Sequence, residues 1–280
     1  MDRTLQFVDT HCHIHEATSS AKASGDKGDE FVRDKWAKGG ITDAKSLIQE
    51  ADIAGVSRLI CVGCTLRDSQ LAVELAQREE NCWASIGIHP HEAKDYLDES
   101  SQNAFSALAT ESRVVAIGEC GLDYYYNHSD KADQIKILEF QLELAKKHDL
   151  PLIFHIREAF DDFWPVFDKF EGLRGVVHSF SSNGRDLEQI LFRGLYVGLN
   201  GIMTFTKDAK QLEAAKAIPL HNLLLETDAP FLTPAPERGT ICLTKHLVLT
   251  AEFLAGLREE NMAEIAKITT QNACNLFSIN

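Results

Sequence analysis

Histidines and carboxylates that follow apolar segments are the residues of this chain best suited to chemistry. The first set lies in residues 7–15, which read FVDTHCHIH. Successive side chains of a strand point to opposite faces, so alternate residues should share a face. One face is expected to hold Asp9, His11, His13 and His15. The other is expected to hold Val8, Thr10, Cys12 and Ile14. Two imidazoles on one face can bind one metal ion, so this segment predicts the start of a metal site.

Five other apolar segments end in polar residues of the same kinds. These endings are His89 with His91, Glu119 with Asp123, His155 with Arg157, His178 with Ser179 and Ser181, and Asp228. A single histidine at a strand end is more often structural, and a single aspartate before Ala-Pro is more often a turn residue. The repetition of the pattern favours a metal site over these separate interpretations.

The candidate ligands are imidazoles and carboxylates, which suit Zn, Mn, Fe or Mg. Four histidines and two carboxylates are enough for two ions, with Glu119 able to bridge them. Two metals about 3.5–4 Å apart stabilise the attacking and leaving oxygens of a displacement and lower the pKa of a bound water toward about 7. Asp228 can then be a ligand and also accept the proton of that water.

Eight short apolar segments alternate with helical segments along the chain. The strands are predicted at 5–10, 57–64, 82–88, 114–120, 152–155, 175–180, 194–199 and 222–227. The helices are predicted at 43–54 with Thr42 as N-cap, and at 67–80, 101–111, 131–148, 157–170, 185–192, 207–217, 245–257 and 262–277. This rhythm predicts a parallel α/β fold.

Eight repeats in 280 residues fit one domain, 1–280, folded as a (β/α)8 TIM barrel. A doubly wound open sheet is the alternative, but no GxGxxG or GxxxxGK[ST] motif indicates nucleotide binding. Barrel enzymes carry their chemistry at the carboxyl ends of the strands, where the polar endings would gather. Residues 16–41 have little pattern and are expected to form a long loop near the site.

The composition constrains the compartment and the partners. No apolar run approaches the roughly 20 residues of a membrane span, and the segment MDRTLQF lacks the apolar core expected of a signal peptide. The seven cysteines are an odd number in mostly apolar runs, which favours free thiols in the cytoplasm. Cys61 and Cys64 form a CxxC that we interpret as a strand ending. The net charge of −14 argues against broad binding of duplex nucleic acid, although bound cations can still recruit an anionic substrate.

At these residues the chain resembles the TatD-type deoxyribonucleases, a branch of the amidohydrolase-like metal-dependent hydrolases. The matching segments are DTHCHIH, IGIHPHEA, AIGECGLDYYY, FQLELAKKHDLP, FHIREA, VVHSFSS, LLLETDAPFLTP and TTQNACNLF. Together they cover most of the chain, and they are specific as a set.

The resemblance implies a (β/α)8 barrel with one or two divalent metal ions, whether Mg, Mn or Zn. The implied ligands are His11, His13, Glu119, His155, His178 and Asp228, with Glu119 and Asp228 in catalytic roles. The implied reaction is hydrolysis of DNA phosphodiester bonds, often exonucleolytic, on single strands or ends.

Four residues beside these positions are expected to contact the substrate. They are His89, Asp123, Tyr125 and Arg157. The planar fork of Arg157 suits a phosphate, although Arg157 can instead pair with Asp161. The tyrosines at 124–126 can instead be packing residues.

Two departures from the family concern the substrate. Residues 16–41 are longer than the usual first connection, and TICLTKHLVLT after Gly239 replaces a basic run. The alternative function is therefore hydrolysis of a small amide, ester, lactone or phosphotriester. A non-enzymatic metal-binding or scaffold protein is a third hypothesis, against which the nearly complete ligand set argues.

Overall fold

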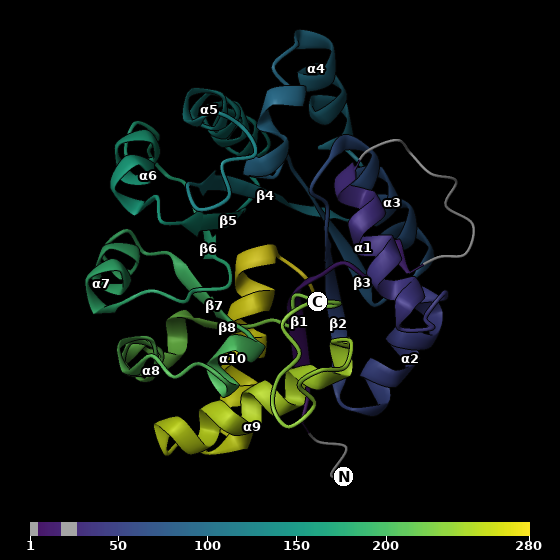
Figure 1. Ribbon diagram of the computed structural model, residues 1–280, viewed down its shortest axis with the longest axis vertical. Helices are drawn as coiled ribbons and strands as arrows, with labels where there is room; N and C mark the ends of the chain where they lie inside the picture. Colours follow the sequence, from purple (N-terminus) through teal and green to yellow (C-terminus); the bar gives the residue numbers. More distant parts are fainter. Residues whose placement is uncertain (1–4, 18–26) are drawn as a thin grey trace.

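The structure, a computed structural model, describes residues 5–17 and 27–280. Within them, eight parallel strands form one sheet in chain order, and Figure 1 shows helices surrounding it as a nearly closed barrel. The strands are β1 (Phe7–Cys12), β2 (Val56–Val62), β3 (Cys82–Ile86), β4 (Val114–Asp123), β5 (Leu152–Arg157), β6 (Gly175–Val177), β7 (Tyr196–Leu199) and β8 (Leu223–Leu225). The predicted (β/α)8 barrel is confirmed.

Helices follow the strands in the expected alternation. They are α1 (Lys27–Lys38), α2 (Ala44–Ile53), α3 (Leu66–Arg78), α4 (Glu99–Leu108), α5 (Lys131–His148), α6 (Phe160–Phe167), α7 (Gly184–Phe192), α8 (Ala209–Ala217), α9 (Leu247–Arg258) and α10 (Met262–Phe277). The predicted spans of α5 and α10 match. The predicted start of α6 at 157 is wrong, because β5 continues through Arg157.

The expectation of a loop over residues 16–41 is wrong for the described part of that segment. Glu16 closes a 3-10 turn, η1 (Ile14–Glu16), and α1 occupies Lys27–Lys38. The predicted residues 18–26 of the loop lie outside the described part. The N-cap of α2 is Asp43 and not Thr42, because the Asp43 carboxylate accepts hydrogen bonds from the amides of Lys45 and Ser46.

The expected alternation along β1 fails at two points. Val8 packs in one apolar cluster and Cys12 in another, because the pairing of β1 with β2 is irregular between Asp9 and Cys12. Irregular pairing of this kind redirects side chains beside active sites. The strand ends at Cys12, so His15 lies in η1 and contacts Asp68 (Nε2–Oδ1 2.6 Å).

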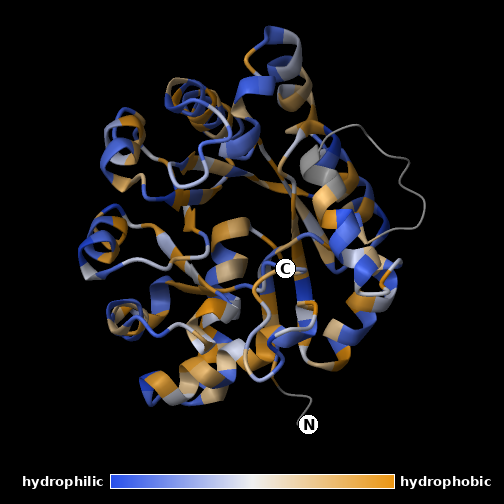
Figure 2. Ribbon diagram, in the orientation of Figure 1, coloured by the Kyte–Doolittle hydropathy of each residue, from blue (hydrophilic) through white to orange (hydrophobic). Residues whose placement is uncertain are grey.

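Two apolar clusters hold the barrel together. The larger contains buried residues of strands and surrounding helices, and Figure 2 shows hydrophobic and hydrophilic residues interspersed along these helices. The smaller joins side chains of the strands to the end of α10. Its members are Val8, Ile60, Val62, Ala116, Ile153, Val176, Leu224, Ala273, Leu276, Phe277 and Ile279. The last turns of α10 therefore complete the core that the strands begin.

Polar contacts join the first strand to the segment that follows the last. The Asp9 carboxylate, fully buried, accepts hydrogen bonds from Thr227 N (2.9 Å) and Thr227 Oγ1 (2.6 Å). Thr10 Oγ1 donates to Leu225 O (3.0 Å). Burial raises the pKa of Asp9 to about 7, against the opposing effect of the Thr227 hydrogen bonds. These contacts close the barrel where β1 meets β8.

Replacing Thr227 with Val tests this closure. The change keeps the shape of the side chain but removes the donor to Asp9 and the acceptor of the Ala229 amide (3.1 Å). We expect a loss of about 1–3 kcal/mol in the free energy of unfolding, because a buried carboxylate oxygen loses its partner. Urea denaturation measures this loss.

Thr110→Val is the matched control, because Thr110 is exposed, and it should change the free energy by less than about 0.5 kcal/mol. Equal unfolding midpoints for the two variants would show that the Asp9–Thr227 contact does not hold the barrel closed.

Candidate metal centre

The carboxylate of Glu119, on β4, lies at the centre of a group of histidines. Its Oε1 atom is 2.9 Å from His155 Nδ1, 3.6 Å from His89 Nε2 and 3.7 Å from His178 Nε2. Its Oε2 atom is 3.3 Å from His11 Nε2. The four imidazoles come from the ends of different strands or the residues just beyond them, so the barrel itself brings these side chains together.

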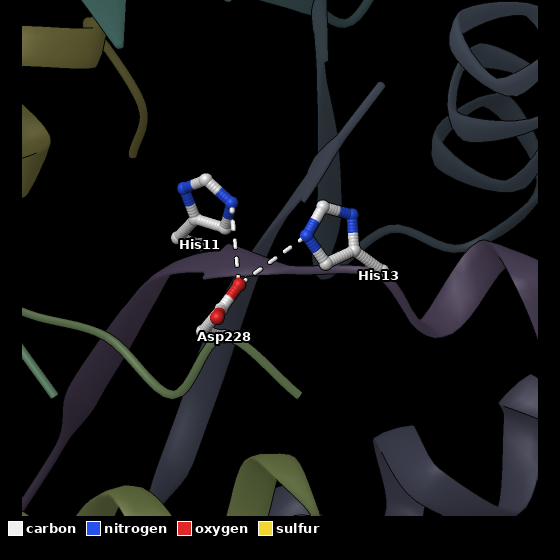
Figure 3. A group of neighbouring side chains, drawn as sticks. All are labelled: His11, His13 and Asp228. Atoms are coloured by element: carbon white, nitrogen blue, oxygen red, sulfur yellow. Dashed lines mark ion pairs between the residues drawn. The ribbon is translucent and has the colours of Figure 1, made fainter. Parts of the chain in front are cut away.

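A second carboxylate, Asp228, lies beside the two histidines at the end of β1 (Figure 3). Its Oδ1 atom is 3.4 Å from His13 Nε2 and 3.7 Å from His11 Nε2. Backbone hydrogen bonds fix this placement, because Asp228 N donates to His11 O and His13 N donates to Ala229 O, both at 2.8 Å. The contacts that close the barrel thus also position the last carboxylate.

Two of the histidines are oriented by groups behind them. His13 Nδ1 lies 2.8 Å from Val62 O, which places a proton on Nδ1 and leaves Nε2 facing Asp228. His178 Nδ1 faces Glu226 Oε1 at 3.0 Å, and Glu226 is buried. A carboxylate or carbonyl behind a histidine is the usual arrangement around metal-binding imidazoles. Glu226 was not among the residues that the sequence singled out.

His11 provides the test of whether these residues fit a metal ion. The residue is fully buried, and among the described residues neither of its ring nitrogens has a hydrogen-bond partner. Buried polar atoms without partners are costly, and a bound cation would satisfy one of these nitrogens. Nitrogen and carboxylate atoms of His11, His13 and Asp228 all lie within 4.8 Å of one another, as do those of His11, Glu119 and His178. The residues fit a divalent metal.

The electrostatics of the centre also favour a cation. Burial alone raises the pKa of Glu119, but His89, His178 and His11 outweigh it and hold that pKa well below the usual range. Burial alone lowers the pKa of His178, but Glu226 and Glu119 raise it to about 10. Both shifts show that buried carboxylates here attract positive charge. Burial and His178 lower the pKa of His11, which keeps this imidazole neutral and able to donate a lone pair.

The four residues predicted to contact substrate have different surroundings. His89 lies beside Glu119, in the group described above. Asp123 is fully buried, and it contacts His155 (2.9 Å) and His91 (3.1 Å). The geometry therefore places Asp123 behind His155 and away from the open surface.

Arg157 and Tyr126 line the cavity at the centre, whereas Tyr125 lies outside that lining and contacts Arg157. The Arg157 guanidinium stacks over Tyr125 (4.3 Å to the ring centroid) and Tyr126 (4.9 Å). The alternative pairing of Arg157 with Asp161 is not what the structure shows, since Asp161 pairs with Arg185 at 3.5 Å. Tyr125 is 53% exposed and therefore available to a ligand.

Cys64 is a residue of the centre that the sequence reasoning missed. Its Sγ atom lies 3.6 Å from Glu119 Oε2, and it forms a third group of candidate ligand atoms with His13 and Glu119. The CxxC motif marked both cysteines but did not indicate that only Cys64 lies at the centre. Cys61 is fully buried, whereas Cys64 follows the end of β2 and faces the cavity.

A cavity of about 500 Å³ opens at these residues. Its polar part includes His13, Cys64, Glu119, His155, His178 and Asp228, and its apolar part includes Phe31, Val32, Ile202, Phe231 and Leu232. The divergent segment after Gly239 lies behind this second part, because Cys242 N donates to Pro230 O (3.2 Å). The candidate ligands thus face a space that can admit a ligand.

Comparison with known proteins agrees with this site. The family model described as TatD related DNase matches residues 8–278. The protein named 3'-5' ssDNA/RNA exonuclease TatD of Cronobacter sakazakii is 38% identical over 247 residues, covering 84% of this chain and 92% of that protein. The uncharacterized metal-dependent hydrolase YabD of Bacillus subtilis is 36% identical over 241 residues, covering 85% and 94%.

A solved structure shows the same architecture. YJJV, a TatD homologue from Escherichia coli, superposes with a TM-score of 0.83 at 27% sequence identity, covering 99% of this chain and 100% of that chain. The barrel and the cluster of histidines and carboxylates agree with the sequence similarity, which extends over nearly the whole chain. This chain therefore belongs to the family of TatD-related DNases, which are metal-dependent hydrolases.

Proposed function

We propose that the protein hydrolyses phosphodiester bonds in single-stranded nucleic acid, acting from an end, with one or two divalent cations (Mg, Mn or Zn). The observation that carries this proposal is the buried Glu119 carboxylate among four imidazoles, with Asp228 beside two histidines. The names of the relatives as single-strand exonucleases support the choice of substrate.

The proposed metal ligands are the six residues of the centre. They are His11, His13, Glu119, His155, His178 and Asp228. A divalent cation bound by them would lower the pKa of a bound water to about 7. It would also supply positive charge to the phosphoryl oxygens. Glu119 lies between the His11 side and the His155 side of the group, which suits a shared ligand.

Asp228 is the proposed acceptor of the proton from the attacking water. Its side chain is 16% exposed, against 6% for Glu119, so a water in the cavity reaches Asp228 more easily. Burial on its own raises the pKa of Asp228, but His13 and His178 lower it below the usual value. The carboxylate is therefore ionised and able to accept a proton at neutral pH.

Arg157, Tyr125 and His89 are the proposed contacts of the substrate. The planar guanidinium of Arg157 matches the geometry of a phosphate, and its stacking on Tyr125 restricts its orientation. For Asp123 we now propose a positioning role, because it holds the His155 ring from behind.

An end-labelled single-stranded DNA assay tests the reaction. Native protein with Mn²⁺ or Mg²⁺ should shorten the strand progressively, and EDTA should abolish this. In Asp228→Asn the rate constant kcat should fall by about 10²–10⁴, the usual contribution of a general base. Labels at either end of the strand give the direction of shortening.

Asp52→Asn is the matched control, because Asp52 is an exposed aspartate on α2, and it should retain native activity. If the metal-loaded native protein leaves DNA and RNA strands intact, the nucleic-acid proposal fails. Hydrolysis of an ester, lactone or phosphotriester lost in Asp228→Asn would then identify the alternative function, which the acidic surface and the divergent segment after Gly239 favour.

Glu226→Gln tests the metal centre separately from catalysis. Removing this buried charge behind His178 should weaken divalent metal binding about 10–100-fold, as loss of outer partners of ligating histidines does. Isothermal titration of metal-free protein with Zn²⁺ or Mn²⁺ measures the affinity. Glu252→Gln, at an exposed position of α9, should bind as the native protein does. Equal affinities in both variants would contradict a metal ligand role for His178.

We also propose that the protein acts in the cytoplasm. All seven cysteines lie in the described residues and are free thiols, as in a reducing compartment. In the described part of the chain, no helix combines the length and apolar character that crossing a membrane requires.

A further inference from the structure

An exposed aromatic ring on α1 lies at the mouth of the metal centre. Phe31 is 64% exposed, and it lines the same cavity as His13, Glu119 and Asp228. Apolar surface in contact with water costs free energy. The ring of Phe31 is nevertheless exposed, and it lies beside a polar site. Phe192, 84% exposed on α7, is a contrasting case because it lines none of the described cavities.

Phe31 is the outer member of an aromatic series that leads to the metal centre. Its ring stacks on Phe231 with a centroid distance of 5.7 Å and an interplanar angle of 11°. Phe231 meets the His13 ring edge-on at 6.3 Å. The amide of Phe231 donates to Asp228 O (2.8 Å), so the inner ring is fixed to the segment of a candidate ligand.

Contacts with His13 and η1 hold α1 in this position. Trp36 is 1% exposed, and its Nε1 donates to His13 O (3.0 Å). Arg33 Nε pairs with the buried Glu16 carboxylate at 2.9 Å. Figure 1 shows α1 as the purple helix at the right of the barrel. The helix is thus joined directly to the backbone of a candidate metal ligand, and Phe31 is presented from a packed element.

The charge of the chain makes an aromatic contact more important. Single-strand binders usually follow the phosphates along a basic groove and stack the bases on aromatic rings. This protein carries 42 acidic and 28 basic residues, so a basic surface contributes less. One cation, Lys35 Nζ, lies 4.7 Å from the Phe231 centroid, next to the rings. In a nucleotide, the flat base is suited to contact an aromatic ring and the neighbouring phosphate is suited to contact the Lys35 ammonium.

We propose that Phe31, supported by Phe231, is a stacking site for one nucleobase of the substrate strand, with Lys35 facing the adjoining phosphate. This inference rests on the proposed action on single-stranded nucleic acid. Phe31 binds the strand and takes no part in the chemistry. Its loss should therefore raise KM and leave kcat unchanged.

The test compares Phe31→Ala, Phe31→Trp and Phe192→Ala with the native protein in Mn²⁺. The substrates are one single-stranded DNA and copies in which one nucleotide near either end lacks its base. Phe31→Ala should raise KM about tenfold on the complete strand, the scale of one base–aromatic stack. At one position, removing the base should raise the KM of the native protein as much as Phe31→Ala raises it on the complete strand. Removing the same base should not raise the KM of Phe31→Ala any further. Phe31→Trp should restore the native KM, and Phe192→Ala should match the native protein.

A native KM in Phe31→Ala, or an equal rise on complete and abasic strands at every position, would overturn the stacking site while leaving the nuclease proposal intact. A fall in kcat that Phe31→Trp fails to restore would also overturn it, by indicating a structural role.

A binding measurement separates this failure from failure of the proposed function. Strands carrying 2-aminopurine near either end are titrated into Asp228→Asn protein with Mn²⁺, with and without Phe31→Ala. Stacking quenches the fluorescence, so quenching at one position that Phe31→Ala removes supports the site, even if the native protein cleaves no strand. Quenching at no position, or quenching that Phe31→Ala leaves unchanged, overturns the site whether or not the native protein is a nuclease.

Discussion

The burial of the Glu119 carboxylate among imidazoles is the constraint on which the rest of the site depends. A charge taken out of water is tolerated only when it is paired and hydrogen-bonded. Here the compensating groups arrive from several strands, because His11, His155 and His178 each lie near a different strand end. Their convergence requires a nearly closed barrel, since an open sheet would spread the same residues along one edge. The architecture and the chemistry therefore impose the same geometry.

Much of this arrangement could be read from the sequence, for physical reasons. Buried parallel strands are continuous apolar runs, and a barrel places their carboxyl ends at one rim, so a polar residue after each run has a predictable location. In the structure, the histidines and both carboxylates that this reasoning singled out lie close together. It failed where the local backbone departs from a regular strand. His15 was expected to share a face with His13, but the strand ends before it and His15 turns to Asp68.

The residues that the sequence did not reveal depend on tertiary contacts. The segment of α1, KGDEFVRDKWAK, has few apolar residues, and its described anchors are Trp36 and Arg33, whose partners lie in η1 and at His13. Glu226 follows β8, and its contact with His178 forms only when the barrel brings the ends of β6 and β8 together on either side of β7. Helices in proteins owe most of their stability to packing, so a weak local pattern did not exclude one. The outer wall of the cavity was therefore the part least accessible to prediction.

The closure of the barrel also determines when the protein becomes competent during its own synthesis. Asp9 and Thr227 are separated by 218 positions in the chain, and Asp228 follows directly. A ribosome-bound chain therefore exposes both β1 histidines and Glu119 long before Asp228 leaves the exit tunnel. Until β8 docks against β1, the centre lacks the carboxylate that lies beside His11 and His13. Contacts so distant in sequence close large loops, so the carboxylate of Asp228 joins the two histidines of the first strand only when most of the chain has been made.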